Sequence, residues 1–256
     1  MVSVENNEEQ FNILEDLTNE ENEKLKIFRG FPICKGIEDQ YLLLFLFSKK
    51  FDLEKSHILI KNNLMIREKL NISFPVVKHQ VNEELAKKSS SFNIIGHRDK
   101  DGRSISYLYP SKLVPKEYSL KDYMTFLLWS QDQSVHDHSS AHREGMTIIE
   151  DLHRISMFKH FDSRMTEFLK KYQLNDMQNV FIGRIQKIYI INSPWVLKPL
   201  LTLAKTFMKS KIISRVEICK RDHIFSKIDP SNVLIEFGGS LNLTYEAYFD
   251  RLPSNF

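Results

Sequence analysis

The chain has 256 residues, of which 42% are hydrophobic and 27% are charged, and its formal net charge at pH 7 is +3. These values are typical of a globular protein with a sizeable core. The small net charge, without a stripe of Lys and Arg, argues against nucleic acid as the main partner. The two cysteines, Cys34 and Cys219, are far apart in the sequence, which predicts free thiols in a reducing compartment.

The N-terminal segment is acidic and contains no basic residue before Lys24. It therefore lacks the features of a signal or transit peptide, and we expect residues 1–30 to form a frayed or weakly helical lead-in. The longest apolar run, from Tyr41 to Phe47, is much shorter than the roughly 20 residues that span a bilayer. These observations predict a soluble, cytoplasmic protein that can associate peripherally with membranes.

The next segment has a helical pattern. We expect Asp39 to cap a helix over residues 40–48 and Asp52 to cap a second helix over residues 53–70, because a short acidic side chain accepts hydrogen bonds from the first backbone amides of a helix. The pattern predicts a small all-helical lobe over residues 1–85.

From residue 86 to residue 256 the pattern becomes mixed. Two short strands flank an Asp101-Gly102 turn, and the second should place Ile105, Tyr107 and Tyr109 on one face. Helical segments, one of them from Leu120 to His142, alternate with three further strands, predicted over 145–152, 187–192 and 215–219. Strands separated by helical crossovers predict an α/β domain with a mixed, largely parallel sheet.

The segment after the strand 187–192 has two distinct sides when it is drawn as a helix. Its apolar side is formed by Val196, Leu200, Leu203, Ala204 and Phe207, and its basic side contains Lys198, Lys205 and Lys209. One interpretation is a crossover helix that packs on the sheet and leaves its lysines in solvent. The other is a helix whose apolar face covers a lipid and whose lysines meet an anionic membrane surface.

Several motifs occur in an order that resembles the CRAL-TRIO lipid-binding family. The most specific is "YIINSPWVLKPL", which resembles the family's gate strand and helix, and the resemblance covers roughly residues 37–242. It implies a sheet that floors an apolar pocket under a gate helix. The other motifs are "LLLFLFSKKFDLEKS", "GHRDKDGRSISYLYP", "GMTIIEDLHRIS" and "LIEFGGSL".

The resemblance also implies functional residues. Lys49-Lys50 and Arg215 correspond to basic residues that hold a lipid headgroup phosphate in some members, although their residue types alone equally fit surface charges. Gly183 and Ile212 stand where those members have a glutamate and a threonine, which predicts that phosphatidylinositol is not the preferred cargo. The expected pocket and gate residues are Tyr107, Tyr109, Val196, Leu200, Leu203, Ala204 and Phe207, with Lys198, Lys205 and Lys209 facing the membrane.

The histidines His136, His138 and His142 are the one cluster that suggests a metal. His138 and His142 are four residues apart, but no third ligand follows at a standard spacing, so we expect an exposed polar helix and no metal or cofactor. No catalytic motif is recognisable, which favours a protein that is not an enzyme.

The sequence therefore predicts a carrier that binds one lipid, a phospholipid or an isoprenoid-like molecule, and transfers or presents it during transient contact with an anionic membrane. The alternative is a scaffold of the same fold that binds a signalling protein such as a small GTPase.

Overall fold

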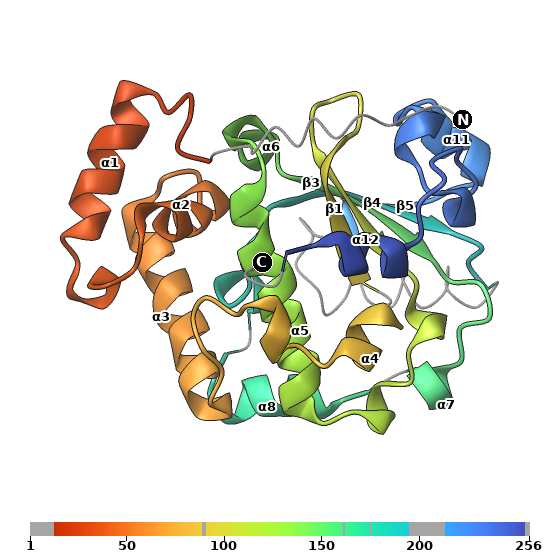
Figure 1. The fold of residues 1–256 in the computed structure, drawn as a ribbon, viewed down its shortest axis with the longest axis horizontal. Coiled ribbons are helices and arrows are strands. Elements are labelled where there is room, and N and C mark those ends of the chain that lie inside the picture. Colours follow the sequence, from red (N-terminus) through yellow and green to blue (C-terminus); the bar gives the residue numbers. More distant parts are fainter. Residues whose placement is uncertain (1–12, 89–90, 161, 175, 195–212, 254–256) are drawn as a thin grey trace.

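The computed structural model describes residues 13–88, 91–160, 162–174, 176–194 and 213–253. Three helices, α1 (Asn19–Arg29), α2 (Asp39–Ser48) and α3 (Leu53–Leu70), gather at one end of the molecule beside a central sheet (Figure 1). No helix within the described ranges is long and apolar enough to cross a membrane.

Helix α1 differs from the expected frayed lead-in. The Thr18 side chain accepts a hydrogen bond from the Glu21 amide at 3.2 Å, and the Glu21 carboxylate accepts one from the Thr18 amide at 2.9 Å. This capping box satisfies two of the free amides at the helix start, and the helix buries Leu25 and Phe28. The expectation of weak structure is therefore wrong for Asn19–Arg29.

The predicted cap of α3 is confirmed, because Asp52 accepts a hydrogen bond from the Lys55 amide at 3.1 Å. The predicted cap of α2 is wrong by one residue. Glu38 is the N-cap, without a side-chain bond, and Asp39 is the first helical residue and pairs with Arg29 of α1. Helix α2 is apolar on all sides because neighbouring helices surround it, and six consecutive residues, 42–47, are buried.

The sheet has the order β1-β2-β3-β4-β5; β1 is antiparallel to β2, and the other neighbours are parallel. The predicted mixed, largely parallel α/β sheet is thus confirmed, as is the hairpin at Asp101-Gly102. The strands are β1 (Ser91–Arg98), β2 (Ser104–Leu108), β3 (Met146–Asp151), β4 (Ile185–Ile191) and β5 (Val216–Ile218).

Helices cover the sheet and connect its strands. The helix predicted from Leu120 to His142 is interrupted at Asp137, because the side chain of His138 accepts from the Ser140 amide and starts a new helix. The further helices are α4 (Glu83–Lys87), α5 (Leu120–Asp132), α6 (Ser139–Glu144), α7 (Met157–His160), α8 (Arg164–Lys171), α11 (Arg221–Phe225) and α12 (Tyr245–Arg251). Short 3-10 helices span Pro32–Cys34, Lys78–Gln80, Pro110–Lys112, Pro115–Glu117, Gln133–His136, Met177–Asn179, Pro230–Asn232 and Ile235–Phe237.

The buried side chains form two hydrophobic clusters. One is built mainly from α1, α2 and the first half of α3, and the other extends from Ile66 in α3 to Phe249 in α12. The first cluster also takes in Val135 and Ile182 from later in the chain. The division of the chain near residue 85 stays a prediction.

A buried ion pair connects α3 to α5. The Arg67 guanidinium donates to both carboxylate oxygens of Asp132, at 2.7 and 3.0 Å, and the two side chains are only 2% and 1% exposed. The Val76 amide donates to Asp132 at 2.8 Å, and Arg67 also donates to Asn63. The charges are therefore paired and hydrogen-bonded, as buried charges must be.

Strand alternation divides the sheet into two faces. Tyr107, Ile149 and Tyr189 are aligned in the strand register and form what we call the tyrosine face. The Tyr107 hydroxyl donates to the Asn232 carbonyl at 2.8 Å, and its ring lies 4.8 Å from that of Phe237. The tyrosine face is therefore closed by the C-terminal part of the chain.

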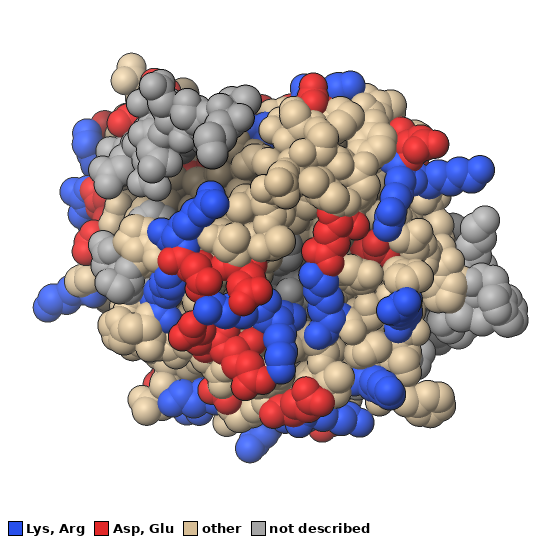
Figure 2. Space-filling model, turned by 45° about the vertical axis from the view of Figure 1, so that its right-hand side comes forward, with Lys and Arg blue, Asp and Glu red and all other residues tan. Residues whose placement is uncertain are grey.

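The opposite face carries mostly aliphatic side chains, and we call it the isoleucine face. Two registered rows of residues form it: Leu108, Glu150, Ile190 and Ile218, and Ser106, Ile148, Ile188 and Val216. On the outside of the molecule, acidic and basic side chains intermingle over the surface shown in Figure 2.

Candidate functional site

The isoleucine face is a broad and mostly aliphatic surface of the sheet. Ile148 and Ile188, on the inner strands β3 and β4, are only half-buried, as are Val216 and Ile218 on the edge strand β5. Residues on the tyrosine face at the same level, such as Ile149, are fully buried. The sheet thus offers a broad aliphatic floor on one side only.

Glu150 is the one charged residue of the two rows that form this floor. It forms no hydrogen bond or ion pair with any residue that the structure describes. Burial raises the pKa of its carboxyl group to about 7. The carboxyl group is therefore held partly protonated near neutral pH.

The adjacent residue, Asp151, is in a contrasting environment at the end of β3. Its buried carboxylate accepts two hydrogen bonds of 2.9 Å from the Asn192 side chain, one of 2.8 Å from the His153 amide and a longer one of 3.3 Å from Arg221. Asn192 follows β4 directly and has a φ of 51°. These contacts fix the ends of β3 and β4 immediately before Ser193.

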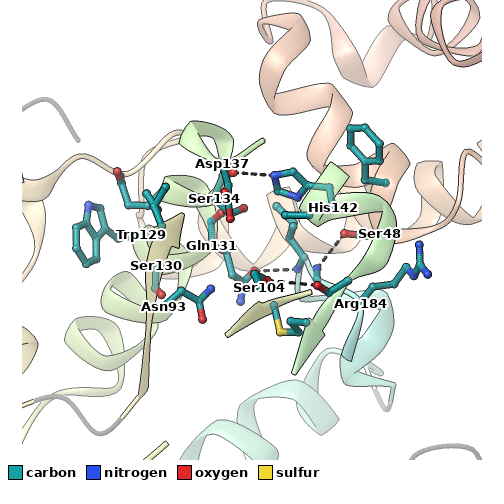
Figure 3. Close-up of a pocket in the computed structure, with 18 of the residues that line it drawn as sticks. Ser48, Asn93, Ser104, Trp129, Ser130, Gln131, Ser134, Asp137, His142 and Arg184 are labelled. Carbon is teal, nitrogen blue, oxygen red and sulfur yellow. Dashed lines mark hydrogen bonds between the residues drawn. The ribbon is translucent and has the colours of Figure 1, made fainter. Parts of the chain in front are cut away.

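A small cavity of about 70 Å³ lies between α2, α5, α6 and the starts of β2 and β3, and we call it the polar cavity after the serine and glutamine side chains that line it together with apolar ones. Figure 3 labels residues from α2, α5, α6 and β2 among those that line this cavity. The Gly183 amide donates to the Ser48 hydroxyl at 2.9 Å and the Ile182 amide to Gln131 at 2.8 Å, whereas the buried Gln133 side-chain oxygen has no hydrogen-bond partner among the residues that the structure describes. Sequence reasoning did not find this cavity, since no motif links its residues.

The polar cavity and the isoleucine face lie on the same side of the sheet. Ser104 and Met146 line the cavity and are paired in the register of β2 and β3. Because side chains alternate along a strand, Met146 shares its face with Ile148. The cavity therefore lies at the N-terminal end of the aliphatic floor.

The histidines differ from the expected exposed helix. The ring of His142 is half-buried, stacks on Phe47 with 5.5 Å between centroids, and lies 2.8 Å from the Ser134 carbonyl oxygen. Burial lowers the pKa of His142 and of His136. The solvated-helix prediction is wrong for His142, and the described residues contain no group of three or more His, Cys, Asp or Glu that could hold a metal.

The basic residues predicted to hold a headgroup lie near the cavity. The Lys49 ammonium donates to the Gln178 carbonyl at 2.6 Å and to the Asn179 side chain at 3.0 Å, and Lys50 is exposed. Arg215 donates to the Ile185 carbonyl, and its charge, together with burial, lowers the pKa of the cavity residue Arg184. Their role in headgroup recognition stays a prediction.

The remaining predicted site residues fall into two groups. Tyr107 is fully buried on the tyrosine face, and the Tyr109 ring lies 5.9 Å from Phe237 and under the Lys112 ammonium. The predicted gate residues Val196, Leu200, Leu203, Ala204 and Phe207, the lysines Lys198, Lys205 and Lys209, and Ile212 lie outside the described residues.

Comparison with known proteins places this site in a family. The CRAL/TRIO domain matches residues 88–239, more than half of the chain, so the protein belongs to the CRAL/TRIO family of lipid-binding and lipid-transfer proteins. The resemblance seen in the sequence is thereby confirmed.

The chain also matches individual proteins. The chain is 75% identical, over the full length of both proteins, to a CRAL-TRIO domain-containing protein of Dictyostelium discoideum. It is 23% identical over 213 residues to human α-tocopherol transfer protein-like, a match that covers 81% of this chain and 60% of the human protein. The crystal structure of Sfh5 matches with a TM-score of 0.46 and 17% identity, over 73% of this chain and 64% of that one.

Proposed function

We propose that the protein carries one hydrophobic lipid, a phospholipid or an isoprenoid-like molecule, against the isoleucine face and transfers or presents it at membranes. The observation that supports this most is the contrast between the isoleucine face, where Ile148, Ile188, Val216 and Ile218 are half-buried, and the closed tyrosine face. Membership in the CRAL/TRIO family supports the same function. In this role the protein catalyses no reaction.

The physical advantage of such a site is the removal of acyl chains from water. Each exposed CH₂ group costs about 0.8 kcal/mol, so a free lipid of ordinary length rarely leaves a membrane unaided. An aliphatic floor such as Ile148, Ile188 and Ile218 compensates for most of that cost. Exchange then depends on opening the site at the membrane surface rather than on passage through water.

The membrane contact is proposed from the sequence. Lys198, Lys205 and Lys209 share one side of the predicted gate helix, and each basic residue near an anionic surface contributes about 1 kcal/mol. Such docking is reversible and weakens at high salt, since the attraction is screened beyond roughly 8 Å. Leu200 and Phe207 on the opposite side would face the cargo.

The decisive experiment fills the isoleucine face with a larger side chain, which should prevent a lipid from binding there. Ile188→Trp inserts a large ring into the middle of the isoleucine face, whereas Ile58→Trp makes the same change at an exposed position on α3. We expect Ile188→Trp to slow phospholipid transfer between vesicles at least tenfold and Ile58→Trp to leave it unchanged, with cooperative unfolding retained in both.

Mass spectrometry of lipids that co-purify with the protein provides the second measurement. A stoichiometric lipid supports the carrier. Transfer unaffected by Ile188→Trp, or a protein that binds no lipid but retains a stable protein partner, would replace the carrier by the scaffold function.

A further inference from the structure

The stretch of chain that leads into β4 is held mainly by side chains of distant helices. Residues 178–183 run from the 3-10 helix Met177–Asn179 toward Ile185, where β4 begins, and we call them the anchored segment. Three of its carbonyl groups and two of its amides are bonded by side chains from α2, from the C-cap of α2, from α3 and from α5. The helices therefore hold this stretch through its backbone.

The three carbonyl groups are bonded by residues at the end of α2 and in the middle of α3. The Lys49 ammonium, at the C-cap of α2, donates to the Gln178 carbonyl at 2.6 Å and to the Asn179 side-chain oxygen at 3.0 Å. On α3, Asn62 donates to the carbonyl of that asparagine at 2.9 Å, and the buried Asn63 donates to the carbonyl that follows, at 3.0 Å. Three successive carbonyl groups are thus bonded in order.

The other end of the anchored segment is fixed beside β3. Its last two amides are bonded to the side chains of α5 and α2 described above. The carbonyl of Arg184, the next residue, accepts a hydrogen bond from the Met146 amide at 2.8 Å. A Cβ atom on Gly145 would lie only 2.5 Å from that carbonyl oxygen, so the glycine permits the close approach. The start of β4 is therefore fixed by the helices and by β3 together.

This anchoring matters because β4 carries part of the aliphatic floor. Ile188 and Ile190 belong to the two rows of that floor, and Asn192 holds the far end of the strand through its bonds to Asp151. A strand that is fixed at both ends presents its side chains in place, so less order has to be imposed when a ligand binds. Loss of the bonds at one end should weaken the binding of any cargo on the floor.

We propose that Lys49 and Asn62 are positioning residues for the cargo site, which hold the anchored segment and through it the start of β4. The inference rests on the proposed carrier function and adds residues that act on the site without touching the cargo. It gives Lys49 a different role from the headgroup contact that the family resemblance implies. The two roles can be separated, because a phosphate contact needs a positive charge, whereas Asn62 holds the anchored segment without one.

Two variants and a matched control test the proposal. Lys49→Met and Asn62→Leu remove the donors and keep side chains of similar size, and Lys61→Met removes the charge of an exposed lysine on α3. Each protein is titrated with phosphatidylcholine vesicles that contain geranylgeraniol, and the lipid recovered with it is quantified by mass spectrometry. Since losing one hydrogen bond shifts an equilibrium about fivefold, the half-saturating lipid concentration should rise about fivefold in both variants. It should not change in Lys61→Met.

Hydrogen exchange of the lipid-free proteins locates the effect. We expect the amides of β4 to exchange about fivefold faster in Lys49→Met and Asn62→Leu, and the amides of the β1–β2 hairpin to exchange at the unaltered rate. A residue that acts only on the cargo would leave the exchange of lipid-free protein unchanged. A residue that contributes only to global stability would accelerate exchange in β4 and in the hairpin alike.

The outcomes separate this inference from the carrier function. Weaker binding of phosphatidylcholine in Lys49→Met but not in Asn62→Leu assigns Lys49 to the headgroup, which overturns the positioning role while the carrier function stands. Unchanged lipid binding in both variants, unchanged exchange in β4, or equally faster exchange in the hairpin overturns it in the same way. If the unaltered protein recovers neither lipid, the carrier function is overturned, and this inference with it.

Discussion

The two faces of the sheet are built from the same strands, yet they differ in how completely they are closed. On the tyrosine face, Tyr107 is fully buried and its hydroxyl is paired with the Asn232 carbonyl. On the isoleucine face, Ile148 and Ile188 are half-buried and Glu150 has no partner among the described residues. The first face is therefore a closed part of the core, and the second is the face against which we propose that the cargo binds.

The largest effect that this comparison predicts is on stability. Tyr107→Ala removes a fully buried ring and leaves the Asn232 carbonyl without its donor, so we expect a loss of about 3–5 kcal/mol in the free energy of unfolding. Ile148→Ala on the half-buried face should cost about half as much. Urea unfolding of the two variants measures the difference, and equal losses would contradict the distinction between the faces.

Glu150 and Asp151, which are neighbours on β3, should differ less in their effect on the free energy of unfolding. Asp151→Ala leaves the Asn192 side chain and the His153 amide without an acceptor, which should lower the free energy of unfolding by about 2–3 kcal/mol. Glu150→Ala removes a carboxyl group that has no described partner, and at about pH 4.5, where that group is protonated in the folded state and its raised pKa costs little, the expected change is within about 1 kcal/mol. A larger loss for Glu150→Ala than for Asp151→Ala, measured by urea unfolding, would show that Glu150 is structural.

The pH dependence of stability gives the smallest effect. The pKa of Glu150 is raised from 4.5 to about 7, so the folded state keeps a proton that the unfolded state has lost, and stability falls as the pH rises through this window. From pH 5.5 to pH 7.5 this single group should cost the lipid-free protein about 2 kcal/mol.

A variant isolates that contribution. His136 and His142 have lowered pKa values and therefore destabilise the fold in the opposite direction, as the pH falls. Glu150→Gln keeps both histidines, so the difference between its pH profile and that of the unaltered protein belongs to Glu150. Superimposable profiles would mean that the carboxyl group is not desolvated.

Local sequence patterns predicted the helices, strands and turns better than they predicted the environment of each side chain. The cap at Asp52, the hairpin at Asp101-Gly102 and the parallel sheet follow from short-range chemistry, and all three are confirmed. The Thr18–Glu21 capping box was equally visible in the sequence and would have predicted α1. In "GMTIIEDL", Glu150 occupies a position that alternation places on the same face as Ile148, so its unusual environment could also have been predicted from the sequence.

The packing of distant segments could not be predicted in the same way. Tyr107 and Ile148 have similar local patterns, and the contacts of Tyr107 with Asn232 and Phe237, far along the chain, show which face is closed. The polar cavity likewise combines residues such as Ser48, Gln133 and Arg184 from separate elements. Hydrophobic periodicity reports that a side chain is buried, but it does not report which partner buries it.

The Arg67–Asp132 pair has a consequence for how the chain matures during synthesis. The two residues are 65 positions apart, and a ribosome adds about 5–20 residues per second. Asp132 therefore emerges roughly 3–13 seconds after Arg67. Throughout that interval the C-terminal half of α3 has no counter-charge to bury, and Val135 and Ile182 are absent from the cluster around α2. The N-terminal helices thus complete their packing only after much of the sheet has been translated, so a nascent chain exposes their apolar surface to chaperones for several seconds.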